Sequence, residues 1–143
     1  MEYLWLIFAL LSAVSAAAVA IFGKIGLQGI DPNTATAIRA IVMALFMISV
    51  VLIQDRFMNL SSILENMKAI FYIVMGGVAG ALSWIFYFIA LKLGKVSQVA
   101  PIDKLSVVFA IILAFLFLGE KISLKIGIGA ALMATGAILI ALG

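Results

Sequence analysis

Residues 3–22, YLWLIFALLSAVSAAAVAIF, form a run of 20 residues without a charged side chain. The hydrocarbon core of a bilayer is roughly 30 Å thick, so an α-helix rising about 1.5 Å per residue needs about 20 apolar residues to cross it. The run follows Glu2 rather than a basic segment, and further apolar runs come after it, which is not typical of a cleaved signal peptide. It therefore predicts a retained transmembrane helix.

The rest of the chain has the same character. Its 143 residues are 67% hydrophobic and 10% charged, too oily to cover a globule in water. The apolar runs are continuous rather than alternating, which favours helices over a β-barrel. No linker divides the chain, so we expect one all-α membrane domain over residues 1–143. Its five transmembrane helices are expected at residues 3–22, 32–53, 69–91, 97–118 and 126–142.

The composition also argues against several classes of function. The chain has no His and no Cys, which removes the usual zinc, haem and thiol chemistry. The net charge of +3 is spread over short loops rather than gathered in a basic block, so nucleic acid is not an expected partner. No nucleophile–base set or phosphate-binding loop is present. We expect neither an enzyme nor a bound metal or cofactor.

Small residues within the predicted helices indicate close helix packing. Gly76 and Gly80 are four residues apart in the third helix, and Gly127 lies in the fifth. Such residues let helix backbones approach each other in a membrane. The contact could lie inside one protomer or between two copies of the chain, and the sequence leaves both open.

Basic residues are almost evenly divided between the two membrane faces that five helices would create. One face would carry four and the other three. The first face would carry Arg56, Lys68, Lys121 and Lys125. The second face would carry Lys24, Lys92 and Lys95. Counting Arg39 and Lys104, which lie inside the helices nearer the second face, makes it four against five. Orientation normally follows an imbalance in these charges. The balance predicts insertion in both orientations and an antiparallel homodimer that imitates an inverted repeat; a fixed topology is the alternative.

Two of the predicted helices have a purely apolar part that is too short. Residues 40–53 and 105–118 each provide 14 residues, about 21 Å at 1.5 Å per residue. Both helices must therefore draw polar residues below the headgroups, from 33–39 and 97–104. Thr36 and Gln98 become candidates for lining a polar cavity in this way.

The charges on these polar segments lie at similar depths. Arg39 is seven residues past Pro32, roughly 10 Å inside, and Asp103 is eight past Lys95, roughly 12 Å inside. Equal depth from one face predicts an Arg39–Asp103 ion pair. Side chains of adjacent helical residues diverge by about 100°, so Asp103 and Lys104 are not expected to pair, and Lys104 would point into the cavity or toward the surface.

Alternatives remain open for this region. Pro101 could start the fourth helix, which would place Asp103 in its first turn and let Lys104 reach the headgroups. Pro101 could instead break the helix and free carbonyl groups toward a cavity. Trp84 and Tyr87 could line the same cavity, or they could belong to the aromatic belt at the membrane interface.

Three stretches resemble the EamA-type domain of the drug/metabolite transporter superfamily. They are FGKIGLQGIDPNTATAIRA (22–40), ALKLGKVSQVAPIDKLSVVFAIILAFLFLGEKIS (90–123) and GIGAALMATGAILIAL (127–142). Members commonly carry two such domains, ten helices related as an inverted repeat, so this chain resembles a half-size, five-helix member. Glu120 in the LGE motif matches the family pattern and is interpreted as a loop or cap residue. The first helix lacks the membrane-embedded glutamate of the four-helix small multidrug resistance branch.

The resemblance implies a secondary transporter, an exporter of small metabolites or drug-like solutes working by alternating access in a prokaryotic inner membrane. The expected partners are the lipid bilayer, a small-molecule substrate and a second copy of the chain. The charges of Arg39, Asp103 and Lys104 sum to +1, which tilts the expectation toward anionic or zwitterionic substrates. A non-transporting subunit that needs an unlike partner, or a flippase for a lipid-linked substrate, remains an alternative.

Overall fold

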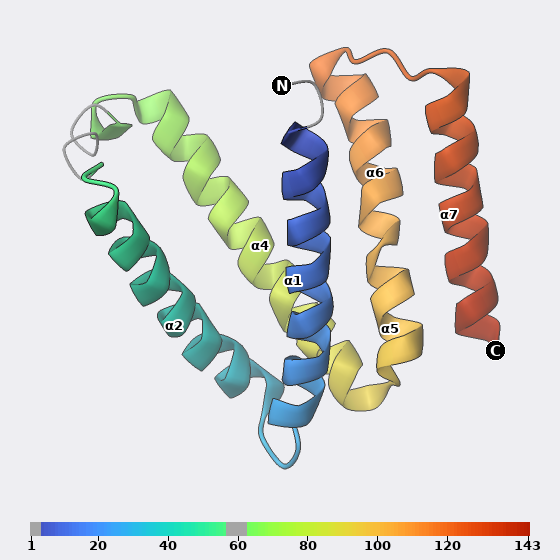
Figure 1. Ribbon diagram of the computed structural model, residues 1–143, viewed down its shortest axis with the longest axis horizontal. Coiled ribbons are helices and arrows are strands. Elements are labelled where there is room, and N and C mark those ends of the chain that lie inside the picture. Colours follow the sequence, from blue (N-terminus) through green and yellow to red (C-terminus); the bar gives the residue numbers. More distant parts are fainter. Residues whose placement is uncertain (1–3, 57–62) are drawn as a thin grey trace. The chain divides into compact units, whose positions relative to one another are not determined.

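All regular secondary structure in the part of the chain that the structure describes is helical. The computed structural model describes residues 4–56 and 63–143, and within them five segments are long and apolar enough to cross a membrane (Figure 1). The five-helix architecture predicted from the sequence is confirmed. Tyr3, the predicted first residue of the first helix, lies outside the described residues.

The spans follow one another in chain order. The first spans are α1 (Leu4–Gly26), α2 (Pro32–Ile53) and α4 (Met67–Leu93). The fourth span, Val96–Leu118, consists of α5 (Val96–Asp103), α6 (Leu105–Leu113) and a π-helical segment (Ala114–Leu118); α7 (Leu124–Leu142) follows.

Side-chain caps set the starts of α2 and α7. The Asp31 carboxylate accepts hydrogen bonds from the backbone N–H of Thr34 at 2.9 Å and from the Thr34 hydroxyl at 3.1 Å, with Pro32 at the first helical position. This is the N-cap that the Asp-Pro pair predicts. The Ser123 hydroxyl accepts from the Ile126 N–H at 3.3 Å, so α7 begins at Leu124, two residues before the predicted start.

The end of α1 lies later than the sequence suggests. We expected the first helix to end at Phe22, but α1 continues through Gly23 and Lys24 to Gly26. A glycine costs about 1 kcal/mol in a helix and lysine is a good helix former, so neither stops a long apolar helix. The chain reverses further on, where Gly29 has a left-handed backbone with φ of 75°.

The fourth span is interrupted near its middle and widened at its end. Helix α5 stops at Asp103 and α6 starts at Leu105, with Lys104 between them. The span ends in a π-helical segment, where the Glu120 N–H donates to the Ala114 carbonyl at 3.3 Å. Gly119 follows with φ of 67°, a left-handed conformation that glycine adopts without strain.

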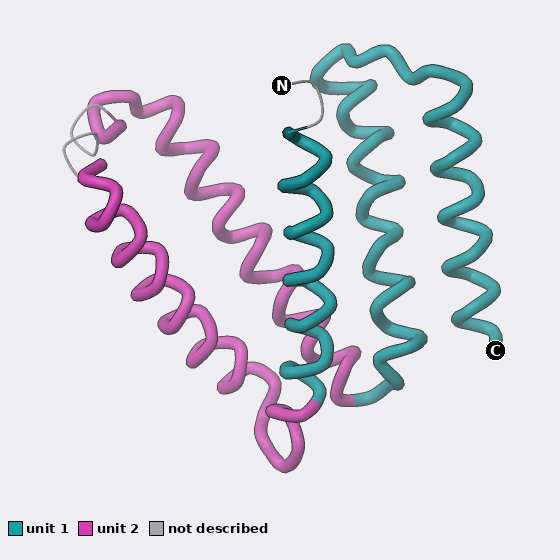
Figure 2. Tube along the Cα trace, in the orientation of Figure 1, with its two compact units in different colours: residues 1–24, 93–143 teal, residues 25–92 magenta. Residues whose placement is uncertain are grey.

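The chain divides into two compact units, coloured separately in Figure 2. Unit 1 comprises residues 1–24 and 93–143, which include most of α1 and all of α5, α6 and α7; in it, α7 packs along both α5 and α6. Unit 2 comprises residues 25–92, with α2 and nearly all of α4. The site residues therefore fall into two groups, one in each unit.

Large apolar side chains are exposed along every span. Phe8 of α1 is 63% exposed, Phe46 of α2 67% and Phe86 of α4 66%. The buried residues are few and mostly near helix ends, such as Leu27, Phe88 and Leu91. Exposure of this kind suits a protein whose solvent is hydrocarbon, since apolar side chains lose nothing by contacting lipid. The chain is a multi-pass membrane protein with its helices in contact with the bilayer.

Candidate functional site

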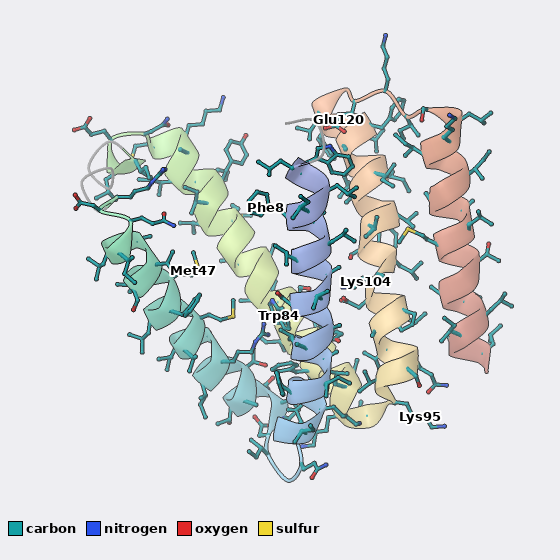
Figure 3. The ribbon with its side chains drawn as sticks, in the orientation of Figure 1. Phe8, Met47, Trp84, Lys95, Lys104 and Glu120 are labelled. Carbon is teal, nitrogen blue, oxygen red and sulfur yellow. The ribbon has the colours of Figure 1, made fainter. Side chains whose placement is uncertain are left out.

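The Arg39 side chain stacks on an aromatic ring inside unit 2. Its Cζ atom lies 3.2 Å from the centre of the Trp84 ring and 5.3 Å from that of Phe88. Arg39 lies on the second turn of α2, and Trp84 and Phe88 are four residues apart on α4, so both rings lie on one face of that helix. Figure 3 labels Trp84 among the side chains of α4. The arrangement is a cation–π contact, which the sequence-based interpretation did not include.

Two further aromatic rings of α4 pack against Trp84 beside this contact. Trp84 packs edge to face against Tyr87 and against Phe88, with ring centres 5.7 Å apart in both cases, and Tyr87 lies 6.2 Å from Phe88. Phe88 is 3% exposed, while Trp84 and Tyr87 are half-buried. We call Arg39, Trp84, Tyr87 and Phe88 the arginine–aromatic cluster. Phe88 was missed from the sequence, although its i, i+4 spacing from Trp84 was a signal that could have indicated it.

The guanidinium edge of Arg39 has no protein acceptor in the described parts of the chain. Its contacts there are with the rings of Trp84 and Phe88. Arginine carries five N–H donors in the plane of its guanidinium, and stacking on a ring uses the face of that plane rather than its edge. The edge is therefore available to an acceptor.

Thr36 and Gln98, two further candidates, differ in their surroundings. Thr36 is buried one turn before Arg39, and its hydroxyl donates to the Pro32 carbonyl at 2.7 Å within the same helix. Its hydroxyl hydrogen is thus already used, which leaves only its oxygen as an acceptor. Gln98 is half-buried on α5 of unit 1.

Asp103 and Lys104 pair with each other, contrary to the expectation from helix geometry. The Lys104 Nζ lies 3.1 Å from the Asp103 Oδ2, with side-chain exposures of 54% and 32% (Figure 3 labels Lys104). The expectation assumed a regular helix through both residues. The helix ends at Asp103, and Lys104 has ψ of −8°, so the usual divergence does not apply and the long lysine stem can reach back. A pair this exposed contributes little to stability.

The break beside this pair lies three residues after Pro101. Helix α5 begins at Val96, which makes Asp103 its last residue and excludes the alternative in which Pro101 starts the helix. Pro101 itself sits inside α5 and lacks the N–H that would bond to Ser97. At the break the Lys104 N–H is shared between the carbonyls of Ala100, at 3.3 Å, and Pro101, at 3.2 Å.

The predicted Arg39–Asp103 ion pair stays a prediction. The two residues belong to different units, and each has a partner in its own unit: Trp84 for Arg39 and Lys104 for Asp103.

The three glycines chosen as packing positions are open in the described structure. A Cβ atom built at Gly76, Gly80 or Gly127 meets no described atom within 4 Å. Their role in helix packing, inside a protomer or between two, stays a prediction.

Two lysines that the sequence reasoning treated only as loop charges bind backbone carbonyls. In unit 1 the Lys24 Nζ donates to the Gly94 carbonyl at 2.7 Å, and in unit 2 the Lys92 Nζ donates to the Ile30 carbonyl at 3.2 Å. Each lies in the last turn of its helix, where a basic side chain interacts favourably with carbonyls at helix ends. That position was a signal available in the sequence.

The residues described hold no group of three or more carboxylate, imidazole or thiol side chains placed to bind a metal ion. The candidate residues provide one guanidinium with its aromatic neighbours in unit 2 and, separately, an acid–base pair at a helix break in unit 1. Charged groups within membrane spans are expensive and mark pathways for solutes or ions. These features define a class, the multi-pass α-helical membrane proteins with charged groups inside their spans.

Comparison with known proteins gives the family. The profile of the EamA-like transporter family matches residues 3–142, so the chain belongs to that family. A protein of a Sinorhizobium species, described as an uncharacterized transporter in the cobO 3′ region, is 40% identical over 141 residues, which cover 99% of each chain. No solved structure matches the chain. The resemblance stated from the sequence motifs is confirmed.

Proposed function

We propose that the chain is a secondary transporter that exports small metabolites or drug-like solutes by alternating access. The family supports transport, and the name of the Sinorhizobium relative agrees with it. The family profile extends over both units, which supports treating residues 1–143 as one transport domain. The bacterial relative supports a prokaryotic inner membrane as its location.

The observation that carries the proposal is the arginine–aromatic cluster inside two spans. A charged residue at the centre of a membrane helix costs about 2.5–3.5 kcal/mol on insertion scales. Arg39 lies roughly 10 Å inside its helix, since it is seven residues past Pro32. The cluster covers one face of the guanidinium and leaves its edge for a solute. A structural role alone would be served as well by an apolar residue at this position.

The proposal includes an antiparallel homodimer with the solute cavity between the protomers. Five spans put the two ends of the chain on opposite faces, so two chains of opposite orientation would reproduce a ten-helix inverted repeat. The near-even division of basic residues supports insertion in both orientations. In this arrangement the Asp103–Lys104 pair and the break after it would line the cavity together with the arginine–aromatic cluster.

Reconstitution of the purified chain alone tests transport. Liposomes containing it are expected to take up or release labelled amino acids and organic acids, with flux lowered at least tenfold by Arg39→Gln and unchanged by Lys125→Ala, which removes an exposed charge outside the cluster. Absence of flux over a broad panel, together with co-purification of an unlike membrane protein, would replace the transporter with a subunit of a larger complex. Movement of fluorescent lipid in place of solutes would indicate a flippase.

Topology reporters test the dimer. Reporters fused to the C-terminus are expected to be active on both sides of the membrane, and cysteine crosslinking is expected to join chains of opposite orientation. Activity on one side only would contradict the antiparallel arrangement and leave the transport proposal standing.

A further inference from the structure

The starting observation is the difference between the two basic groups inside the spans. Lys104 has a carboxylate partner, Asp103, at 3.1 Å. Arg39 has aromatic rings and no carboxylate in the described residues of its unit. A cation–π contact attracts the charge but does not neutralise it. Arg39 therefore keeps its full positive charge below the membrane surface.

The distance to Trp84 fixes how the guanidinium lies. An N–H pointing at the ring would place the nitrogen nearest to it and push Cζ further away by a bond length. A Cζ atom 3.2 Å from the ring centre fits a guanidinium lying over the face of the ring. Its N–H donors then point outward, parallel to the ring, in the fork that matches the two oxygens of a carboxylate.

Both helices place this fork at a similar depth. Arg39 is seven residues from the start of α2 at Pro32, and Trp84 is nine residues from the end of α4 at Leu93. At about 1.5 Å per residue these separations are roughly 10 Å and 14 Å. The contact with Trp84 holds the arginine at this depth, whereas a free side chain would extend toward the headgroups.

We propose that the edge of Arg39 is an oxyanion-binding site that takes the carboxylate of a small solute with an apolar body. The inference rests on the proposed transport function and names the substrate class for its site. The fork binds the two carboxylate oxygens, and the apolar side chains around it accept the rest of the solute. A solute is favoured over a lipid phosphate because Trp84 keeps the fork below the headgroups.

The same geometry excludes cations from the ring. The face of Trp84 that lies toward α2, where an ammonium group would stack at this site, is occupied by Arg39 itself. Quaternary ammonium compounds are therefore not ligands of the intact site. Removal of the guanidinium exposes the ring and converts the preference from anion to cation.

Tryptophan fluorescence provides a direct measurement, because the chain has two tryptophans. Trp5 is 68% exposed on α1 and lies outside the cluster, so Trp5→Phe leaves Trp84 as the sole tryptophan. In the purified full chain carrying this change, 4-methylpentanoate is expected to alter Trp84 emission saturably, and its neutral amide is expected to have no effect. Introducing Arg39→Gln into the Trp5→Phe chain should weaken carboxylate binding at least tenfold and allow tetramethylammonium to bind.

Two further variants make the test independent of folding failures. Arg39→Lys keeps the charge but loses the planar fork, and it should weaken carboxylate binding several-fold. Lys95→Ala removes an exposed charge outside the cluster and should leave binding unchanged. Should Arg39→Gln lose its helical circular dichroism, the comparison of Arg39→Lys with Lys95→Ala decides the question.

Several results would overturn the proposal. Equal carboxylate binding by Arg39→Gln and the parent would overturn it. So would a Trp84 emission change that follows the anionic lipid content of nanodiscs rather than the added solute, because that result would assign the fork to lipid phosphate. Liposome flux separates this from the proposed function. Flux without carboxylate binding at Trp84 refutes the site alone, whereas binding at Trp84 without flux of any solute refutes transport alone.

Discussion

At the level of single residues, the ring of Trp84 takes the position beside Arg39 that a carboxylate usually takes beside a charge in a membrane. Depth along the helix could be calculated from the sequence, and it led to Asp103 as the expected partner. Which side chain on another helix meets Arg39 depends on how α2 and α4 rotate about their axes. That rotation is set by packing, for which a chain this uniformly apolar gives little sequence signal.

The Asp31 cap gives a pH-dependent prediction at the same scale. The backbone hydrogen bond from Thr34 lowers the pKa of the Asp31 carboxyl below its ordinary value of about 3.9. Because the pKa is lowered in the folded state, the cap stabilises α2 fully at a pH above the ordinary pKa of an aspartate. It loses this contribution as the pH falls through the pKa of Asp31 in the folded state. Asp31→Asn keeps a capping oxygen that does not titrate in this range.

Thermal unfolding in detergent between pH 6 and pH 3 checks this. We expect the melting temperature of the parent to fall relative to that of Asp31→Asn as the pH drops below about 4. Parallel curves over the whole range would show that the Asp31 carboxylate contributes nothing to stability through its charge.

At the level of elements, the local signals differed in how directly they determined a helix boundary. Asp31 and Pro32 define the start of α2 through their own side chains, so their effect could be read directly. Gly23 and Lys24 did not end α1, because a long apolar helix tolerates both. The pairing of Asp103 with Lys104 was missed for a related reason, since it depends on the interruption of the fourth span at Lys104.

Gly119 and Gly80 should respond oppositely to alanine. Gly119 has φ of 67°, so Gly119→Ala should cost about 1–2 kcal/mol of unfolding free energy at the end of the π-helical segment. Gly80 lies inside α4 with open space around a built Cβ, and Gly80→Ala should gain about 0.5–1 kcal/mol. Unfolding of both variants by denaturant in mixed micelles measures these differences.

The sign of the Gly80 result also carries information on packing. A loss of stability in Gly80→Ala would mean that another helix closes on this position, from the other unit or from a second chain.

At the level of the whole molecule, the two predicted membrane faces differ little in their number of basic residues. On one face Lys24 and Lys92 bind backbone carbonyls at helix ends, whereas on the other Arg56, Lys68 and Lys125 are exposed side chains. The count that predicts dual insertion comes from the sequence alone. The structure adds that part of the charge on one face also ties loops to helix ends.

One added charge should therefore shift the orientation. Gln28→Arg adds a basic residue to the face that carries the C-terminus, and we expect it to raise the fraction of chains whose C-terminus is cytoplasmic. Ile122→Arg adds one to the opposite face and should lower that fraction. Paired C-terminal reporters measure both, and an unchanged ratio in the two variants would indicate that topology is fixed by something other than these charges.

The contact between Arg39 and Trp84 also has a consequence for biogenesis. Trp84 follows Arg39 by 45 residues (84 − 39), and a ribosome adding about 5–20 residues per second needs roughly 2–9 s to make that stretch. During this interval α2 enters the membrane with its guanidinium uncovered. Chains truncated after residue 56 should insert α2 less completely than chains extended through residue 93, as glycosylation mapping would measure. From the stacked ring we therefore expect the membrane integration of α2 to depend on the synthesis of α4.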